Sequence, residues 1–396
     1  MMQISPETQL FIREHSSDDV RVLALQAKKY PDIDMPTAIT QIAGRKVAAE
    51  KIPSWWEIEK IWYPKHLSLE QCSSEITARY KARLLQGDSL TDLTGGFGID
   101  CSFLATGFKS TTYVERQEEL CDIAAHNFPV LNLYHINIKN EDGVTYLQAM
   151  SPVDCLFLDP ARRNEHGGKT VAISDCEPNV AELEELLLQK ANRVMIKLSP
   201  MLDLSLALKE LKQTQEVHIL SVNNECKELL ILLGQTSPAE ISIHCVNLFT
   251  KGTQKEQHFV FTREQEQCSE CTYTDSLETY LYEPNASLLK AGAFRSIAAA
   301  YPVRKLHPNS HLYTSDTFIE NFPGRIFRIV NQCSFNKKEV KENLADLKKA
   351  NVTVRNFPAT VAELRKRIHL AEGGDTYLFA STLNNGQKVL IRCEKV

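Results

Sequence analysis

The sequence of 396 residues contains no long apolar run. A membrane-spanning helix needs roughly 18 or more consecutive apolar residues, and no segment approaches that length. The first residues, MMQISPETQLFIREHSSDDV, also lack the basic start and apolar core of a secretion signal. We therefore expect a cytoplasmic protein without a membrane partner. The oligomeric state is left open.

A disulfide framework and low-complexity tracts are missing as well. The eleven cysteines are an odd number, scattered from Cys72 to Cys393, which is unlike a small secreted domain. Cys268-Ser-Glu-Cys271 has no second pair at zinc-ligand spacing, so no metal is expected there or elsewhere. With 43% hydrophobic and 24% charged residues, the chain has an ordinary globular composition, and its length predicts two or three cores.

Charge is distributed unevenly along the chain. The net charge is −5 overall. From residue 284 to the end, 18 Lys and Arg stand against 9 Asp and Glu, whereas the rest of the chain carries an excess of 14 acidic residues. Such a split favours a polyanion-facing module joined to a catalytic one. A solvated basic helix face is the alternative.

The apolar pattern predicts three regions. Residues 1–85 show helical spacing broken by prolines and form a helical N-terminal domain. Residues 86–275 alternate strands and helices, which predicts a Rossmann-like, doubly wound α/β sheet with helices on both faces. Residues 276–396 form a small α+β domain, with helices predicted over 286–300, 337–349 and 360–369. The predicted strands of the central region are 89–93, 110–115, 153–158, 193–197 and 217–222, followed by an edge hairpin of 240–249 and 258–263.

A glycine-rich loop follows the first predicted strand. It reads Asp92-Leu-Thr-Gly-Gly-Phe-Gly98 and precedes a helix. Glycines let the backbone turn tightly and approach a ligand, and in a parallel sheet this loop lies at the carboxyl edge, where cofactors bind. The loop matches neither the dinucleotide fingerprint nor the phosphate loop, which argues against NAD and ATP.

Acidic residues end the strands that follow. Glu115 ends the second strand, 23 residues after Asp92, where a carboxylate can accept hydrogen bonds from both ribose hydroxyls. Asp142 follows the third strand and could reach an adenine amino group, with a surface turn as the alternative. The fourth strand ends in Asp159-Pro160-Ala161-Arg162-Arg163 at the same edge, where Asp159-Pro160 could also simply stop the strand.

In this order the motifs resemble those of class I methyltransferases that use S-adenosylmethionine (SAM), over residues 68–263. The resemblance implies that the methionine end of SAM is lined by Asp92, Thr94, Gly95, Gly96 and Gly98. It further implies that Glu115 holds the ribose, that Asp142 lies near adenine, and that Asp159 and Pro160 face the substrate. In relatives that methylate exocyclic amines of bases, a second proline and an aromatic residue follow, where this chain has Ala161 and Arg162.

Upstream, Leu69-Glu-Gln71-Cys-Ser-Ser74-Glu75 opens a predicted helix. This segment resembles the helix before the glycine loop in several RNA methyltransferases, where glutamine and hydroxyl groups close over the cofactor. The resemblance assigns Gln71 and Ser73 to SAM binding. A plain helix cap is the alternative for the serines.

The Asp-Pro-Ala-Arg signature and the small C-terminal α+β module together resemble a bacterial group of methyltransferases with a THUMP-like domain. In related enzymes THUMP modules dock structured RNA, usually tRNA. The resemblance thus implies structured RNA (tRNA or rRNA) as a partner of the basic C-terminal region, where phosphate attraction supplies affinity. The candidate phosphate contacts are Arg295, Arg304, Lys305, Arg325, Lys337, Lys338 and residues 365–367.

The expected activity is SAM-dependent methylation of a base in structured RNA. Methyl transfer depends mainly on positioning. Asp159 is expected to accept a proton or orient the acceptor nitrogen, and Arg162 to bind a substrate phosphate. Lys197 and Ser199 either shape the pocket or end the fifth strand. Two alternatives stay open: a methyltransferase for a protein or small molecule, and a non-catalytic RNA-binding protein with a relict methyltransferase fold. The sequence does not fix the target nucleotide or atom.

Overall fold

The structure is a computed structural model that describes residues 4–162, 172–236 and 238–396. The chain divides into two compact units, residues 1–215 with 230–238, and residues 216–229 with 239–396. Within the described residues, no helix combines the length and the apolar character needed to cross a bilayer. All eleven cysteines lie at described positions and are free thiols.

The N-terminal part of the first unit is helical. It contains α1 (Pro6–Glu14), α2 (Val20–Leu25), α3 (Met35–Lys51), α4 (Pro53–Trp56), α5 (His66–Gln71) and α6 (Glu75–Ala82). Ser5 and Asp34 cap the starts of α1 and α3, since their side chains accept hydrogen bonds from backbone N–H groups of the first turn. Each helix also has a proline in its first turn, where no helical N–H donor is needed. Trp55 is only 2% exposed and packs edge-on against Phe97 of the glycine loop. The later helices therefore share a core with the loop.

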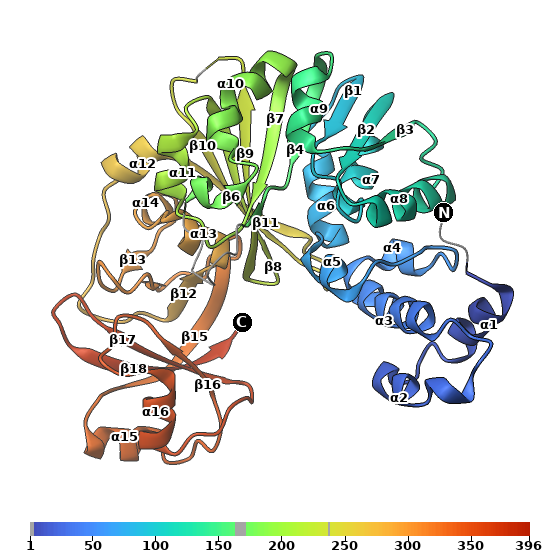
Figure 1. Cartoon of the computed structure of the whole chain (residues 1–396). Coiled ribbons are helices and arrows are strands. Elements are labelled where there is room, and N and C mark those ends of the chain that lie inside the picture. Colours follow the sequence, from blue (N-terminus) through green and yellow to red (C-terminus); the bar gives the residue numbers. More distant parts are fainter. Residues whose placement is uncertain (1–3, 163–171, 237) are drawn as a thin grey trace. The chain divides into compact units, whose positions relative to one another are not determined.

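The larger of the sheets has nine strands in the order β11-β10-β8-β9-β7-β4-β1-β2-β3 (Figure 1). Its strands are β1 (Ser89–Asp92), β2 (Ser110–Glu115), β3 (Ile136–Asn140), β4 (Val153–Leu158), β7 (Ala191–Leu198), β8 (Thr214–Val222), β9 (Glu225–Gly234), β10 (Ser242–Leu248) and β11 (Glu256–Thr262). The pairs β3-β2, β2-β1, β1-β4, β4-β7 and β8-β10 are parallel. The predicted doubly wound α/β sheet is confirmed.

Helices connect the parallel strands, as the right-handed crossover of such a sheet requires. They are α7 (Ile99–Ala105), α8 (Glu118–Val130), α9 (Gly143–Ala149), α10 (Val180–Lys190) and α11 (Leu204–Glu210). Side chains of α7 and α8 pack with Tyr113 of β2 in one core cluster. A short two-stranded ribbon of β5 (Ala161–Arg162) and β6 (Cys176–Glu177) follows β4.

The edge hairpin is confirmed, since β10 and β11 pair in antiparallel fashion. Strand β9 is absent from the predicted set. Its run Leu229–Leu233 is fully buried, and it joins β8 through Asn223 and Asn224, both with positive φ (49° and 68°). Two consecutive positive-φ residues form the tight turn of a hairpin, and asparagine tolerates that conformation. The sequence pattern missed this turn because it contains no glycine.

The C-terminal part of the second unit contains a seven-stranded sheet with the order β13-β14-β12-β15-β18-β17-β16. Its strands are β12 (Tyr280–Pro284), β13 (Arg304–Lys305), β14 (Tyr313–Ser315), β15 (Gly324–Ser334), β16 (Asn351–Val354), β17 (Thr376–Thr382) and β18 (Lys388–Lys395). The helices of this unit are α12 (Arg263–Cys268), α13 (Ala286–Ala291), α14 (Ser296–Ala300), α15 (Lys337–Leu344) and α16 (Val361–Ile368). α15 and α16 lie side by side and bury Leu344 and Leu364 against the sheet (Figure 1).

Two predicted helices are shorter than expected. The helix predicted over 286–300 is two helices, because Gly292 adopts a left-handed conformation (φ 79°) that ends α13. The helix predicted over 337–349 ends at Leu344, and Ala350 behind it is fully buried. Apolar spacing alone continues through such ends, whereas backbone geometry decides where the helix stops.

Leu364→Ala tests the packing of α16. The side chain is fully buried among the apolar residues of β17, β18 and α15, so its loss should lower local stability by about 2–5 kcal/mol. Hydrogen exchange of peptides from residues 324–395 should accelerate accordingly. Val361→Ala in the same helix is the control, since Val361 is 37% exposed and its change should stay within about 0.5 kcal/mol. Equal exchange in the two variants would contradict this packing.

Candidate active site at the carboxyl edge of the sheet

The glycine loop is held by backbone hydrogen bonds. The Gly95 N–H donates to the Val114 carbonyl at 2.8 Å, and the Gly96 N–H donates to the Glu115 carboxylate at 2.9 Å. A Cβ on Gly95 would lie 2.2 Å from the Tyr113 ring, so no larger residue fits there. Gly98 has a φ of 86° and occupies the N-cap position of α7. The loop thus depends on its glycines for space and for backbone conformation.

Asp92 lies at the end of β1 and is 1% exposed. One carboxylate oxygen accepts the Thr94 N–H at 3.0 Å, whereas the other, Oδ2, is buried and has no hydrogen-bond partner among the described residues. Burial, together with the nearby Asp100, Asp159 and Glu115 carboxylates, raises the pKa of Asp92 well above its ordinary value. A buried carboxylate oxygen without a partner is costly to maintain, and a ligand that donates a hydrogen bond would remove that cost.

Thr94 and Glu115 connect neighbouring strand ends. The Thr94 hydroxyl accepts a hydrogen bond from the Asp159 N–H at 2.6 Å, which ties the end of β1 to the end of β4. Glu115 is 8% exposed, and its carboxylate also accepts a hydrogen bond from the Gln117 N–H at 2.8 Å. Glu115 therefore fixes both its own strand end and the glycine loop, and each of its oxygens retains a lone pair.

A buried ionic network lies behind these strand ends. Asp100, in the first turn of α7, pairs with Lys81 of α6 at 2.9 Å and with Lys197 of β7 at 3.5 Å. The Ser73 hydroxyl donates to Asp100 at 2.7 Å and accepts from Lys81 at 2.8 Å. Burial acts to raise the pKa of Asp100, but the two lysines and Ser73 outweigh it, so its pKa is lowered. We call these four residues the Asp100 network.

Lys197 joins the Asp100 network to the substrate side of the site. Its ammonium lies 2.5 Å from Asp159 Oδ2. Burial raises the pKa of Asp159, while Lys197 acts in the opposite direction. Asp159 Oδ2 thus carries a hydrogen bond from a cation at the carboxyl end of β4, next to Pro160. Because Lys197 stabilises its charge, this carboxylate can orient an acceptor group and accept a proton.

The other residues predicted to bind SAM or the substrate differ in exposure and in hydrogen-bond partners. Gln71 ends α5 and is exposed, and Ser73 belongs to the Asp100 network. Asp142 is exposed and caps α9 by accepting the Val144 and Thr145 N–H groups, each at 3.0 Å. The backbone of Arg162 belongs to β5, whereas its side chain and Arg163 lie outside the described residues.

Sequence reasoning missed Lys81 and Asp100. Lys81 is fully buried, one helical turn after the buried Thr77 and Ala78 of α6. A lysine on the buried face of a predicted helix could have indicated a buried ionic partner. Asp100 comes two residues after Gly98 in the first turn of α7. Long-range pairing between them could not be deduced from spacing.

This arrangement defines a class of protein. A parallel sheet with the order β3-β2-β1-β4-β7, a glycine loop after the first strand and acidic residues at the following strand ends form the frame of a Rossmann-like methyltransferase. Family models agree for the C-terminal region: a ferredoxin-like domain matches residues 280–323, and a THUMP domain-like model matches residues 324–395.

The particular family follows from a solved structure. A "putative methyltransferase" from Porphyromonas gingivalis W83 is 34% identical, with 100% of both chains covered and a TM-score of 0.88. The chain belongs to the family of that protein, the bacterial methyltransferases with a C-terminal THUMP-like domain. No curated protein matches the chain.

Two more distant structures are also similar to parts of the chain. One is a modification subunit of a type I restriction enzyme, named as putative, from Vibrio vulnificus YJ016 (11% identity, TM-score 0.35, 51% of this chain and 56% of that one). The other is a Streptococcus mutans protein in complex with SAH (13% identity, TM-score 0.30, 40% of this chain and 96% of that one). At these TM-scores neither adds to the functional argument.

Asp92→Asn should change the pH dependence of stability. Because folding raises the pKa of Asp92, wild type loses stability as the pH rises from the unfolded value near 3.9 toward the raised folded pKa. The variant lacks this loss, so the difference in melting temperature should move in its favour as the pH rises above about 4.

Asp154→Asn is the matched control, with the opposite sign. Hydrogen bonds from the Ser89 and Asp88 N–H groups lower the pKa of Asp154, so its contribution is present above the unfolded pKa and is lost as the pH falls through the folded value. This variant should fall further behind wild type as the pH rises toward about 4, and the difference should stay constant above that pH. A pH-independent difference for Asp92→Asn would show that Asp92 is not held in a strongly perturbed state.

Proposed function

We propose that this protein transfers a methyl group from SAM to a base in structured RNA, tRNA or rRNA. The main support for this proposal is the geometry of one sheet edge. There the strand ends bring Asp92, Glu115, Asp159 and Lys197 around the glycine loop. The family membership supports methyl transfer. The THUMP-like domain and the basic C-terminal region support RNA as the substrate.

The residues fit SAM. Its ammonium and its ribose hydroxyls are hydrogen-bond donors, and the loop offers carboxylates as acceptors. Oδ2 of Asp92 is buried and has no partner among the described residues, so a donor on the ligand would satisfy it. Around Gly96 there is room, since a Cβ built there would meet no atom closer than 3.8 Å. Asp92, Thr94, Gly95, Gly96 and Gly98 would hold the methionine end.

The other assignments follow the same edge. Glu115 would accept hydrogen bonds from the ribose hydroxyls through its free lone pairs while it keeps the loop in place. Asp142 would lie near adenine in addition to capping α9. Gln71 is proposed to close over the cofactor from the end of α5. Ser73 is proposed to contribute from the same side, although its hydroxyl is engaged in the Asp100 network.

The chain's own residues would position the acceptor and move the proton. SAM supplies an electrophilic methyl group on a positively charged sulfur, and transfer requires in-line approach of the acceptor. Asp159 would orient the acceptor nitrogen and receive its proton, with Lys197 stabilising the carboxylate at 2.5 Å. Pro160 fixes the backbone after Asp159, and Arg162 is proposed to bind a substrate phosphate.

A basic strip on the C-terminal domain is the proposed RNA contact. Lys337 and Lys338 start α15, Lys366 and Arg367 lie in the last turn of α16, and all four are exposed. Arg367 lies 4.1 Å over the ring of Phe335, which brings the end of α16 next to the start of α15. We propose that these four exposed side chains contact adjacent phosphates of the RNA. We call the four residues the α15–α16 strip.

Other basic residues of this region have internal partners. Arg304 pairs with Glu278, Arg325 pairs with Glu283, and Arg365 donates to the carbonyls of Ala350 and Ala371. Lys305 is 2% exposed and donates to the Pro308 carbonyl, so it is not available to a phosphate. Arg295 is exposed, but its guanidinium donates to the Gln267 carbonyl at 2.9 Å. The proposed RNA contact is thereby narrowed to the α15–α16 strip.

Labelled SAM and total RNA from cells lacking the protein test this function directly. Wild type should bind SAM in calorimetry and label RNA. Asp159→Asn should lower the labelling rate by about 10²- to 10⁴-fold and leave SAM affinity within a few-fold, because a general base contributes about that much to rate. Asp88→Asn, at an exposed ion pair with Lys109, is the control and should match wild type.

The possible failures are distinct. Absence of SAM binding would identify a relict methyltransferase fold. SAM binding without RNA labelling would exclude RNA and point to a protein or small-molecule acceptor. Full activity of Asp159→Asn would remove Asp159 from the chemistry.

Substitution of the α15–α16 strip by alanine tests the RNA interaction separately. Because the variant can no longer neutralise RNA phosphates with these four side chains, the slope of log affinity against log salt should become shallower by up to about 3, while SAM affinity stays unchanged. Lys28→Ala/Lys29→Ala, at exposed positions of the N-terminal helical region, is the charge control. RNA affinity that falls equally in both variants would indicate a nonspecific charge effect.

A further inference from the structure

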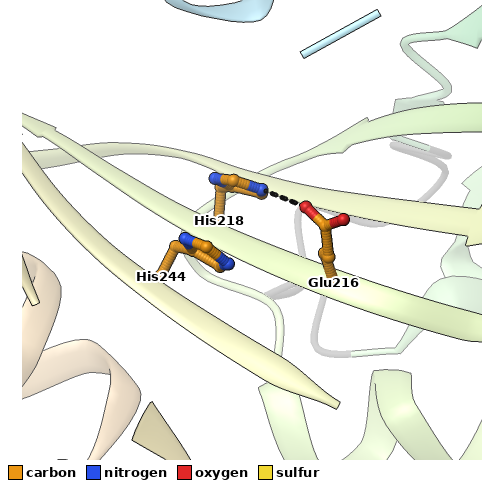
Figure 2. Close-up of side chains that lie close together, drawn as sticks. All are labelled: Glu216, His218 and His244. Carbon is orange, nitrogen blue, oxygen red and sulfur yellow. Dashed lines mark hydrogen bonds and ion pairs between the residues drawn. The ribbon is translucent and has the colours of Figure 1, made fainter. Parts of the chain in front are cut away.

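Three imidazoles and a carboxylate lie on one face of β8, β10 and β11. Glu216 and His218 are two residues apart in β8 and therefore point to the same side. His244 is the direct neighbour of His218 on the parallel strand β10, and His258 on β11 is opposite Val246. All four belong to the same compact unit. Figure 2 shows Glu216, His218 and His244 gathered over these strands.

The distances within this group are short. His218 Nε2 lies 3.2 Å from Glu216 Oε2, and His244 Nδ1 lies 3.1 Å from His258 Nε2. The rings of His218 and His244 stack with centroids 4.3 Å apart and an angle of 17° between their planes. Glu216, His218 and His244 can each offer one ligand atom such that all three atoms lie within 4.8 Å of one another.

Two of the three imidazoles have little or reduced access to solvent. His218 is 2% exposed, and His244 is half-buried. A neutral imidazole keeps one nitrogen lone pair, which is the form that binds a metal.

We propose that Glu216, His218 and His244 bind a divalent transition metal of the Zn²⁺ type. Two imidazoles with one carboxylate are ligands that Zn²⁺ accepts, whereas Mg²⁺ and Ca²⁺ prefer oxygen alone. Ligand bonds of about 2.0–2.1 Å in a tetrahedral site put neighbouring ligand atoms about 3.3 Å apart. The His218–Glu216 pair already has this separation.

Binding requires a rotation of the His244 ring. The lone pairs of two stacked rings lie in nearly parallel planes, so the stack must open before both rings can bind one ion. The ligand atoms, which lie within 4.8 Å of one another, must also move to about 3.3 Å apart. His258 acts as the outer partner: His244 donates to it from Nδ1 and presents Nε2 to the metal. Water completes the fourth position. The ion would join β8 to β10.

Metal-stripped protein titrated with Zn²⁺ tests the site, with a chromophoric chelator as competitor. One equivalent should bind and raise the melting temperature. His244→Phe keeps a stacking ring without a lone pair, and it should weaken Zn²⁺ binding by at least about 100-fold, as should Glu216→Gln. His258→Phe should weaken it by about 10- to 100-fold, the usual effect of losing an outer partner. His15→Ala, far along the chain in the N-terminal helical region, should match wild type.

Binding of Co²⁺ distinguishes this site from the cysteines. The proposed ligands give no thiolate charge-transfer band, whereas binding by Cys268 and Cys271 would. Thiolate bands that disappear in Cys268→Ser, wild-type affinity in His244→Phe, or absence of stoichiometric binding would each overturn the proposal. Equal melting temperatures of wild type and His244→Phe without metal establish that both are folded. SAM binding and RNA labelling do not depend on these outcomes, so failure here leaves the proposed function untouched.

Discussion

The buried carboxylate of Asp100 is the constraint on which the active-site edge depends. A charge with so little access to water requires compensation, and Lys81, Lys197 and Ser73 provide it from three other parts of the chain. The same contacts fix α6, α7 and β7 relative to one another. Loss of one partner would leave a charge buried, so the network specifies position rather than adding much stability.

Because the Asp100 network holds these elements in place, the strand ends can keep several carboxylates close together in a buried site. Asp92 is buried near three other carboxylates, and one of its oxygens has no hydrogen-bond partner among the described residues. The Thr94–Asp159 and Gly96–Glu115 hydrogen bonds keep the loop in a conformation that glycines alone can adopt. A cationic, hydrogen-bond-donating ligand bound at this edge would relieve the repulsion between the carboxylates.

The second unit combines features of different kinds. Its THUMP-like domain carries exposed charge at the meeting point of α15 and α16, above a fully apolar core. Its part of the large sheet carries a histidine group between strands. The first suits a polyanion, because exposed cations exchange counterions for phosphates. The second suits a small, directional ligand, because imidazole nitrogens can offer lone pairs in fixed directions.

The sequence by itself determined the sheet, the order of its acidic strand ends and the glycine loop, because short apolar runs, helical spacing and a cluster of glycines are local properties of the chain. The ranges of β2 and β4 were predicted without error. Only the tertiary structure decided that Lys81 meets Asp100, that Lys197 bonds to Asp159, that Lys305 is buried, and that Glu216, His218 and His244 converge. Those contacts join residues far apart in the chain, and apolar periodicity carries no information about which polar side chains will meet.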